Sequence, residues 1–345
     1  MQKGVLVDRR ELIKSVLNGQ RTHRLPRALF GGGRWFWKQT GQIPEDIETD
    51  PAGFAEKLAA LYHELDTDIV FAGSGMNSFP AEAIGGELAF KEGQAPLLAH
   101  PIIEKTEDAR YLDHVDIALS PHSLALIAMI VDLRKRLPDR YLCVTSWGPF
   151  TWGMILCEWN MLQERTTHDP EFIREVCSLG VRLSLALFKP LIEMGSVDGV
   201  VISDGAATLV PLDLYREVVL SSERRVFEQI KPGIARFLHQ CGAIAPQFSL
   251  YPDSGADCIS IDAGVRLADA YRLFNPRAVT AGNLDVIKNV FGGDPGTMCG
   301  AVADSVDGIP ELFTKFILMP SCDLPPDTPL PNVRAFLACA DRLGH

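Results

Sequence analysis

The stretch DGVVISDGAATLVPLDLYREVVLSSERRVFEQIKPGIARFLHQCG (198–242) decides the fold. Two compact apolar runs, 198–205 and 235–242, flank a segment at 211–234 in which apolar residues recur with helical spacing. A short apolar run bounded by turn residues is typical of a buried strand, and helical spacing of apolar residues is typical of an amphipathic helix. The stretch therefore predicts a strand, a helix and a second strand parallel to the first.

The same alternation continues along the chain in both directions. The candidate strands are 27–32, 68–75, 141–148, 198–205, 235–242, 257–262, 278–283 and 316–322. Eight strands, each followed by a helix, favour a closed (β/α)8 barrel of the TIM type over an open doubly wound sheet. Residues 76–139 are too long for one such unit and predict an excursion before the third strand. We expect one α/β barrel domain over 1–345, with an N-terminal extension ahead of the first strand.

Composition excludes several classes of protein. The 345 residues are 47% hydrophobic and 22% charged, which is typical of a globular chain with a large core. The net charge is −11 (33 basic against 44 acidic residues), and no dense basic run is present, so we expect no nucleic-acid partner. No stretch reaches the roughly 18 apolar residues of a membrane helix, and no secretory signal begins the chain. These features predict a cytoplasmic protein without a membrane span.

Eight cysteines are spread over the chain without a regular spacing. This pattern does not fit a disulfide scaffold, so we expect reduced thiols, most of them small buried core residues.

Two of the cysteines stand out by position. His239 and Cys241 are two residues apart in a predicted strand, so their side chains lie on the same face, and Gly242 follows at once. Cys322 ends the last predicted strand, FILMPSC. Barrel active sites are built at the C-terminal ends of strands, where these three residues are expected to meet.

One imidazole and two thiolates suit Zn²⁺, and three protein ligands leave a fourth position open, as in catalytic zinc sites. The residues alone also allow a plainer interpretation, because His-x-Cys is a short motif. His239 and Cys241 can be ordinary core residues, and Cys322 can be a buried thiol.

Other polar residues at predicted strand ends are weaker candidates. Asp204, Asp262 and Asn283 each lie at the end of a strand, and Glu82 lies in the excursion. We expect these four to bind polar groups of a substrate, and one of them, water or the substrate itself to fill the fourth position on the metal. A helix cap or a loop hydrogen bond is the alternative role for each.

Several segments together resemble the uroporphyrinogen decarboxylase superfamily, in particular its corrinoid-dependent methyltransferase branch. They are GRWFWKQTGQIPEDI (33–47), AEAIGGELAF (81–90), SWGPFTW (146–152), DGVVISDG (198–205), FLHQCG (237–242), GADCISID (255–262), AGNLD (281–285) and FILMPSCDLPPDTPLPNVRAF (316–336). The most specific are FLHQCG and the last segment, because the methyltransferase branch pairs His-x-Cys with a distant Cys ahead of such a proline-rich loop.

The resemblance implies zinc held by His239, Cys241 and Cys322. It also implies methyl transfer between the methylcobalamin of a partner corrinoid protein and a small molecule, either tetrahydrofolate or a thiol such as coenzyme M.

Decarboxylation of uroporphyrinogen is the alternative that the same superfamily offers. The decarboxylases carry the signature MRQAGRY, whose two arginines hold the acidic tetrapyrrole. The matching residues here are 37–43, where Lys38 keeps one charge and Gln42 loses the other. Replacing Arg by Gln removes a cation and its paired donors, so methyl transfer is the favoured expectation.

Overall fold

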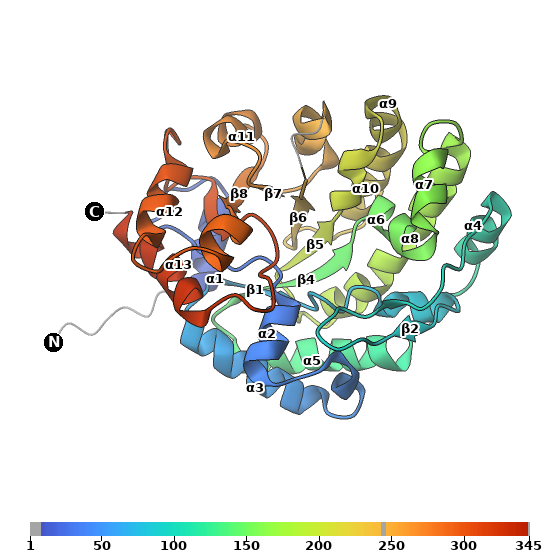
Figure 1. Ribbon diagram of the computed structural model, residues 1–345, viewed down its shortest axis with the longest axis horizontal. Coiled ribbons are helices and arrows are strands. Elements are labelled where there is room, and N and C mark those ends of the chain that lie inside the picture. The colour runs from blue at the N-terminus through green and yellow to red at the C-terminus, as the bar shows by residue number, and fades with distance from the viewer. Residues whose placement is uncertain (1–7, 243–245, 344–345) are drawn as a thin grey trace.

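The computed structural model describes residues 8–242 and 246–343. Its centre is one parallel sheet in which each strand pairs with the next in the order β1-β4-β5-β6-β7-β8-β9, and helices surround the strands (Figure 1). The strands are β1 (Ile69–Ala72), β4 (Tyr141–Trp147), β5 (Gly199–Ser203), β6 (Ala235–Gln240), β7 (Cys258–Ile261), β8 (Val279–Leu284) and β9 (Phe316–Pro320). The predicted α/β barrel is confirmed.

The first predicted strand closes the barrel with only two residues. Arg27 bridges to Leu318 of β9, and Ala28 bridges to Ile69 of β1, both in parallel register. The prediction of a strand over 27–32 was therefore wrong in extent. Gly31 and Gly32 have φ of +52° and +79°, which is left-handed backbone that ends the extended run ahead of α2.

Helices follow the strands on the outside of the barrel, and several begin at the caps that the sequence provides. Asp169 accepts from the N–H of Phe172, and Pro170 occupies the first helical position of the long α8. The α-helices of the described residues are α1 (Arg9–Leu17), α2 (Gly33–Thr40), α3 (Pro51–Leu65), α4 (Thr106–Asp113), α5 (Pro121–Arg136), α6 (Pro149–Leu156), α7 (Trp159–Arg165), α8 (Pro170–Glu193), α9 (Leu212–Leu214), α10 (Leu220–Glu228), α11 (Leu267–Phe274), α12 (Met298–Val306) and α13 (Leu330–Arg342).

Shorter helical turns complete the connections. They are the 3₁₀ turns η1 (Pro44–Glu48), η2 (Phe79–Ile84), η3 (Gly205–Leu209) and η5 (Pro246–Ser254), and the π-helical turns η4 (Tyr215–Val219) and η6 (Val286–Phe291). The predicted excursion contains η2, the antiparallel hairpin of β2 (Leu88–Ala89) and β3 (Leu97–Leu98), and α4, while α5 is the helix that leads into β4.

The core has two parts because strand residues alternate in direction. Phe71, Val201, Phe237 and their counterparts on the other strands form a cluster inside the barrel, and Ile13 of α1 joins it. The intervening residues pack against the surrounding helices in a second, larger cluster.

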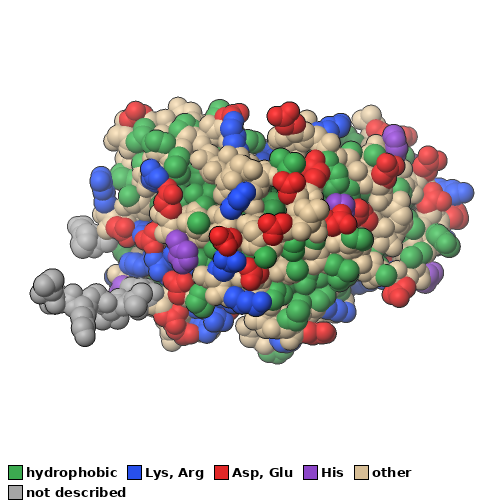
Figure 2. Space-filling view, turned by 90° about the horizontal axis from the view of Figure 1, so that it is seen from below, with side chains coloured by type: hydrophobic (Ala, Val, Ile, Leu, Met, Phe, Trp, Pro, Cys, Tyr) green, Lys and Arg blue, Asp and Glu red, His purple; other side chains and the backbone are tan. Residues whose placement is uncertain are grey.

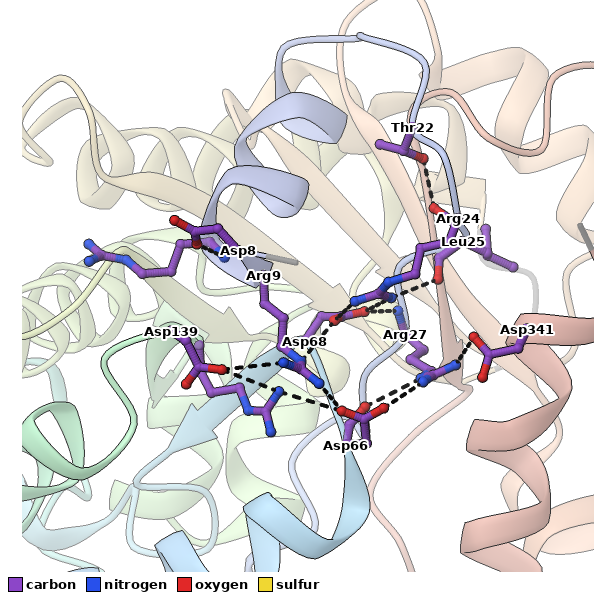
Figure 3. Close-up of polar contacts among 12 residues, drawn as sticks. Asp8, Arg9, Thr22, Arg24, Leu25, Arg27, Asp66, Asp68, Asp139 and Asp341 are labelled. Carbon is purple, nitrogen blue, oxygen red and sulfur yellow. Dashed lines mark hydrogen bonds and ion pairs between the residues drawn. The ribbon is translucent and has the colours of Figure 1, made fainter. Parts of the chain in front are cut away.

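A network of ion pairs ties the chain segments together where α1 meets the start of β1 (Figure 3). Asp68 has a fully buried side chain and pairs with Arg9 and Arg24, and it accepts the N–H of Arg27 at 2.9 Å. Arg27 also pairs with Asp341 of α13 at 2.5 Å. These contacts hold the N-terminal segment, β1 and the last helix in one arrangement.

One pair of cysteines departs from the expectation of reduced thiols. Cys299 of α12 and Cys339 of α13 form a disulfide, with Cα atoms 5.1 Å apart. The two helices pack side by side, which brings the cysteines together across 40 residues of sequence. The other six cysteines are free.

Two surface properties complete the description. Among the described residues, no helix combines the length and the apolar character that a membrane crossing requires. On the face drawn in Figure 2, acidic and basic side chains are interspersed.

Candidate metal centre

The structure brings His239, Cys241 and Cys322 together. His239 lies near the end of β6, Cys241 directly follows that strand, and Cys322 lies two residues after β9. Their ligand atoms all lie within 4.8 Å of one another. Nε2 of His239 and Sγ of Cys322 lie 3.8 Å apart, although the two residues are 83 positions apart in sequence.

His239 is held in a fixed orientation. It follows the interior residue Phe237 by two positions, so it also faces the barrel axis, and it is 2% exposed. The ring of Phe30 stacks on the imidazole with centroids 3.9 Å apart. Nδ1 lies 3.0 Å from the hydroxyl of Ser260, its register partner on β7. With Nδ1 engaged, Nε2 is the nitrogen left for a metal.

The two thiols interact directly. The hydrogen bond between them lowers the pKa of Cys241 and raises the pKa of Cys322. Burial opposes the first shift and adds to the second. Cys241 is therefore the thiol that ionises first, and binding of a metal to both sulfurs has to displace the protons that the two thiols still carry.

Asp323 follows Cys322 and contacts the glycine turn at 31–33, and it was not identified from the sequence. Its carboxylate accepts the N–H of Gly32 at 3.1 Å, and a Cβ on Gly31 would lie 1.5 Å from its Oδ1. Burial raises the pKa of Asp323. Its position next to Cys322 was the available signal, but only the fold shows that the glycine turn at 31–33 packs against it.

Asp204, which was predicted to bind substrate, is fully buried. Its carboxylate accepts the backbone N–H of Thr151 at 2.7 Å and of Phe150 at 3.3 Å, so it caps the start of α6. Burial raises its pKa to about 6. The contacts of Asp204 are those of a helix cap, and substrate binding by this residue stays a prediction.

Asn283 and Glu82 also have partners within the protein. The amide of Asn283 donates to the carbonyls of Asp262 and Val265, which fixes the loop after β7. Glu82 lies 3.0 Å from Nδ1 of His122, at the start of α5. It is not part of the cluster of ligand atoms, and its predicted role stays untested.

Asp262 lies in a different setting. A cavity of about 540 Å³ is lined by Asp262 together with Arg34, Asp285, Cys322 and Asp323. One candidate metal ligand and one predicted substrate-binding residue thus share a cavity. Arg34, in the first turn of α2, was not identified from the sequence, because nothing in its local spacing distinguishes it from a solvated helix residue.

The two positions that match the decarboxylase arginines are both engaged elsewhere. Lys38 is exposed and forms an ion pair with Asp327. Gln42 is buried, donates to the carbonyl of Phe54 at 3.2 Å and accepts from the hydroxyl of Thr40 at 2.7 Å. Neither residue lines the cavity beside Cys322.

Solved structures with the same fold include a methyltransferase and a methionine synthase. A methyltransferase from Methanosarcina mazei aligns over 97% of this chain and 98% of that chain with a TM-score of 0.79 and 22% identity. A B12-independent methionine synthase from Shewanella sp. W3-18-1, solved with selenomethionine, aligns over 94% and 96% with a TM-score of 0.54 and 14% identity.

The curated relatives are named uroporphyrinogen decarboxylase. Uroporphyrinogen decarboxylase from Streptomyces griseus is 27% identical over 273 residues, which cover 73% of this chain and 72% of the relative. The enzyme of the same name from Streptomyces coelicolor is 29% identical over 273 residues, covering 73% and 74%.

The family comparison spans almost the whole chain. The sequence model described as "Uroporphyrinogen decarboxylase (URO-D)" matches residues 8–343. This range contains every barrel strand and all three residues of the candidate metal centre. The chain belongs to the uroporphyrinogen decarboxylase family of enzymes.

Proposed function

We propose that this protein is a zinc-dependent methyltransferase. It moves a methyl group between the methylcobalamin of a corrinoid protein and a small molecule, either tetrahydrofolate or a thiol such as coenzyme M. The observation that carries the proposal is the convergence of His239, Cys241 and Cys322 at the C-terminal ends of two barrel strands.

The donor set fits zinc. Zinc bonds of about 2.0 to 2.3 Å in tetrahedral geometry put neighbouring donor atoms about 3.5 to 3.8 Å apart. Nε2 of His239 and Sγ of Cys322 lie 3.8 Å apart. Within the described ranges no fourth His, Cys, Asp or Glu joins the cluster. A three-ligand site with an open position is the arrangement of catalytic zinc.

The protein's own groups set the charge of the site. Ser260 and Phe30 hold His239 with Nε2 directed at the thiols. Cys241 and Cys322 would bind zinc as thiolates. Zinc, when bound, lowers the pKa of a thiol in the open position, so that a thiolate is present at neutral pH.

In the direction towards a thiol, the substrate sulfur forms a bond to the methyl carbon while the carbon–cobalt bond of the methylcorrinoid breaks. The electron pair of that bond remains on cobalt, and the thiol proton leaves to solvent. The barrel contributes position and electrostatics, and the reactive methyl group comes with the corrinoid protein.

Decarboxylation is the second candidate, since the curated relatives carry that name. The side chains of Lys38 and Gln42, which are both paired with other residues of the protein, argue against decarboxylation. A substrate with many carboxylates needs paired cations, and the exposed Lys38 and the neutral Gln42 do not supply them.

Metal analysis tests the proposal. Protein purified without chelator is expected to hold about one zinc per chain, and Cys322→Ser is expected to lose it. Cys157→Ala, which changes a free buried cysteine outside the site, is the matched control and should keep zinc. Wild-type protein without stoichiometric zinc would overturn the proposal.

Two assays then separate the reactions. Methyl transfer changes the visible spectrum of the corrinoid, and we expect this change with wild type and not with Cys322→Ser. Uroporphyrinogen is expected to remain unconverted by wild-type protein. Formation of coproporphyrinogen would favour the decarboxylase alternative.

A further inference from the structure

The cavity beside Cys322 contains an arginine without a partner. Arg34 is half-buried, and within residues 8–242 and 246–343 its side chain has no hydrogen bond and no ion pair. A guanidinium has five N–H donors in a planar fork that matches a carboxylate. An unpaired Arg in a cavity next to a metal centre is therefore suited to an anionic group of a ligand.

The same cavity is also acidic, which argues against a purely anionic ligand. Asp262 uses Oδ1 to accept the N–H of Gly264 at 2.9 Å. Asp285 uses Oδ1 to accept the N–H groups of Ile287 and Lys288. The second oxygen of each carboxylate has no partner among the described residues, so both remain available to a cation.

One Arg and three carboxylates, those of Asp262, Asp285 and Asp323, lie in one space and favour a ligand with both charges. A plain anion would be attracted by Arg34 and repelled by Asp262 and Asp285, whereas a zwitterion satisfies all three. Cys322 lines the same cavity, so a ligand held there lies beside the candidate zinc position. Its volume of about 540 Å³ is ample for a molecule of amino-acid size.

We propose that this cavity binds a zwitterionic thiol, with Arg34 binding its carboxylate and Asp262 and Asp285 binding its ammonium group. The inference rests on the proposed function, because the thiol is the group that zinc would activate. It narrows the small methyl acceptor or donor to an amino-acid thiol.

Titration calorimetry with three thiols, carried out on zinc-loaded protein, tests which charged groups of the ligand contribute to binding. L-Homocysteine carries both charges, 4-sulfanylbutanoate lacks the ammonium group, and 3-sulfanylpropan-1-amine lacks the carboxylate. Wild type is expected to bind L-homocysteine about tenfold more tightly than either analogue, since a charged hydrogen bond is lost in each case. Equal binding of L-homocysteine and either analogue would overturn the inference.

Variants assign the charges to residues. Arg34→Gln is expected to weaken L-homocysteine binding about tenfold and to leave the amine unaffected. Asp262→Asn keeps the acceptor for Gly264 and is expected to weaken L-homocysteine but not 4-sulfanylbutanoate. Arg174→Gln removes an exposed Arg of α8 outside the cavity and should change nothing. Arg34→Gln with unchanged discrimination among the thiols would contradict the assignment.

The zinc content of every sample separates this inference from the proposed function. If zinc-loaded protein binds the three thiols equally well, the proposal of a zwitterionic ligand is overturned and the proposed function is not. Protein that never holds zinc overturns the proposed function, and L-methionine then tests the cavity by itself, because it carries both charges without a thiol. Binding of L-methionine that Arg34→Gln abolishes supports the cavity assignment, and no binding to wild type overturns it.

Discussion

Gly205 lies against the thiol of Cys241, since a Cβ at position 205 would stand 2.4 Å from Sγ. This glycine begins η3 and follows Asp204, whose N–H donates to the carbonyl of His239 at 3.0 Å. The absence of a side chain at 205 thus leaves the space that the sulfur of Cys241 occupies. The geometry of the candidate metal centre thus depends on a glycine that supplies no ligand atom.

Gly205→Ala is expected to lower zinc affinity at least about tenfold, because one misplaced ligand costs more than 1.4 kcal/mol of binding. Competition with a chromogenic chelator measures this affinity. Gly300→Ala is the control, because nothing lies within 4 Å of a Cβ at that helical position. Unchanged zinc affinity in Gly205→Ala would show that Cys241 is not a ligand.

Asp204 gives the stability of the protein a specific dependence on pH. Its pKa is about 6 in the fold against 3.8 for the free group, because burial outweighs the two backbone hydrogen bonds. A raised pKa means that the folded state binds the proton more tightly. The contribution of Asp204 to stability is therefore greatest below pH 3.8 and is lost as pH rises to about 6.

The shift corresponds to roughly 3 kcal/mol. Asp204→Asn removes this titration, so the difference in free energy of unfolding between wild type and variant should change by about 2 kcal/mol of this amount between pH 4 and pH 6. Urea unfolding at a series of pH values measures it. A difference that stays constant across this range would contradict the assignment.

Asp68 is expected to be a main support of the N-terminal segment. Asp68→Asn leaves Arg9 and Arg24 without their buried partner and should lower the free energy of unfolding by about 3 to 5 kcal/mol. Glu11→Gln breaks only the exposed pair with Lys14 and should cost less than about 1 kcal/mol. Equal effects of the two variants in chemical denaturation would refute this view of the network in Figure 3.

Counting the free thiols of the protein tests the disulfide between Cys299 and Cys339. Under denaturing conditions with chelator and without reductant, a thiol reagent should find six thiols per chain, and eight after reduction. Eight thiols before reduction would show that the pair is open. Replacing both cysteines by Ala should lower the free energy of unfolding by about 3 to 4 kcal/mol, given their sequence separation of 40.

Local patterns were enough to predict most of the barrel. Strands such as β6 and β9 are short apolar runs between longer amphipathic segments, and this alternation is visible without any tertiary contact. The same period of two placed His239 and Cys241 on one face. The strand at 27–32 was overestimated, because apolar character does not reveal where left-handed glycines end an extended segment.

The tertiary structure decided everything that depends on residues far apart in the chain. The predicted strand ends placed Cys322 and His239 at the same end of the barrel, and the family resemblance paired them, but only the fold shows their ligand atoms 3.8 Å apart. The same holds for Gly205 against Cys241, for Arg34 beside Cys322, and for the pairing of Cys299 with Cys339. Periodicity reports which way a side chain points within its own element. Which side chains meet depends on how the strands close into a barrel and on how the connecting segments pack across its ends.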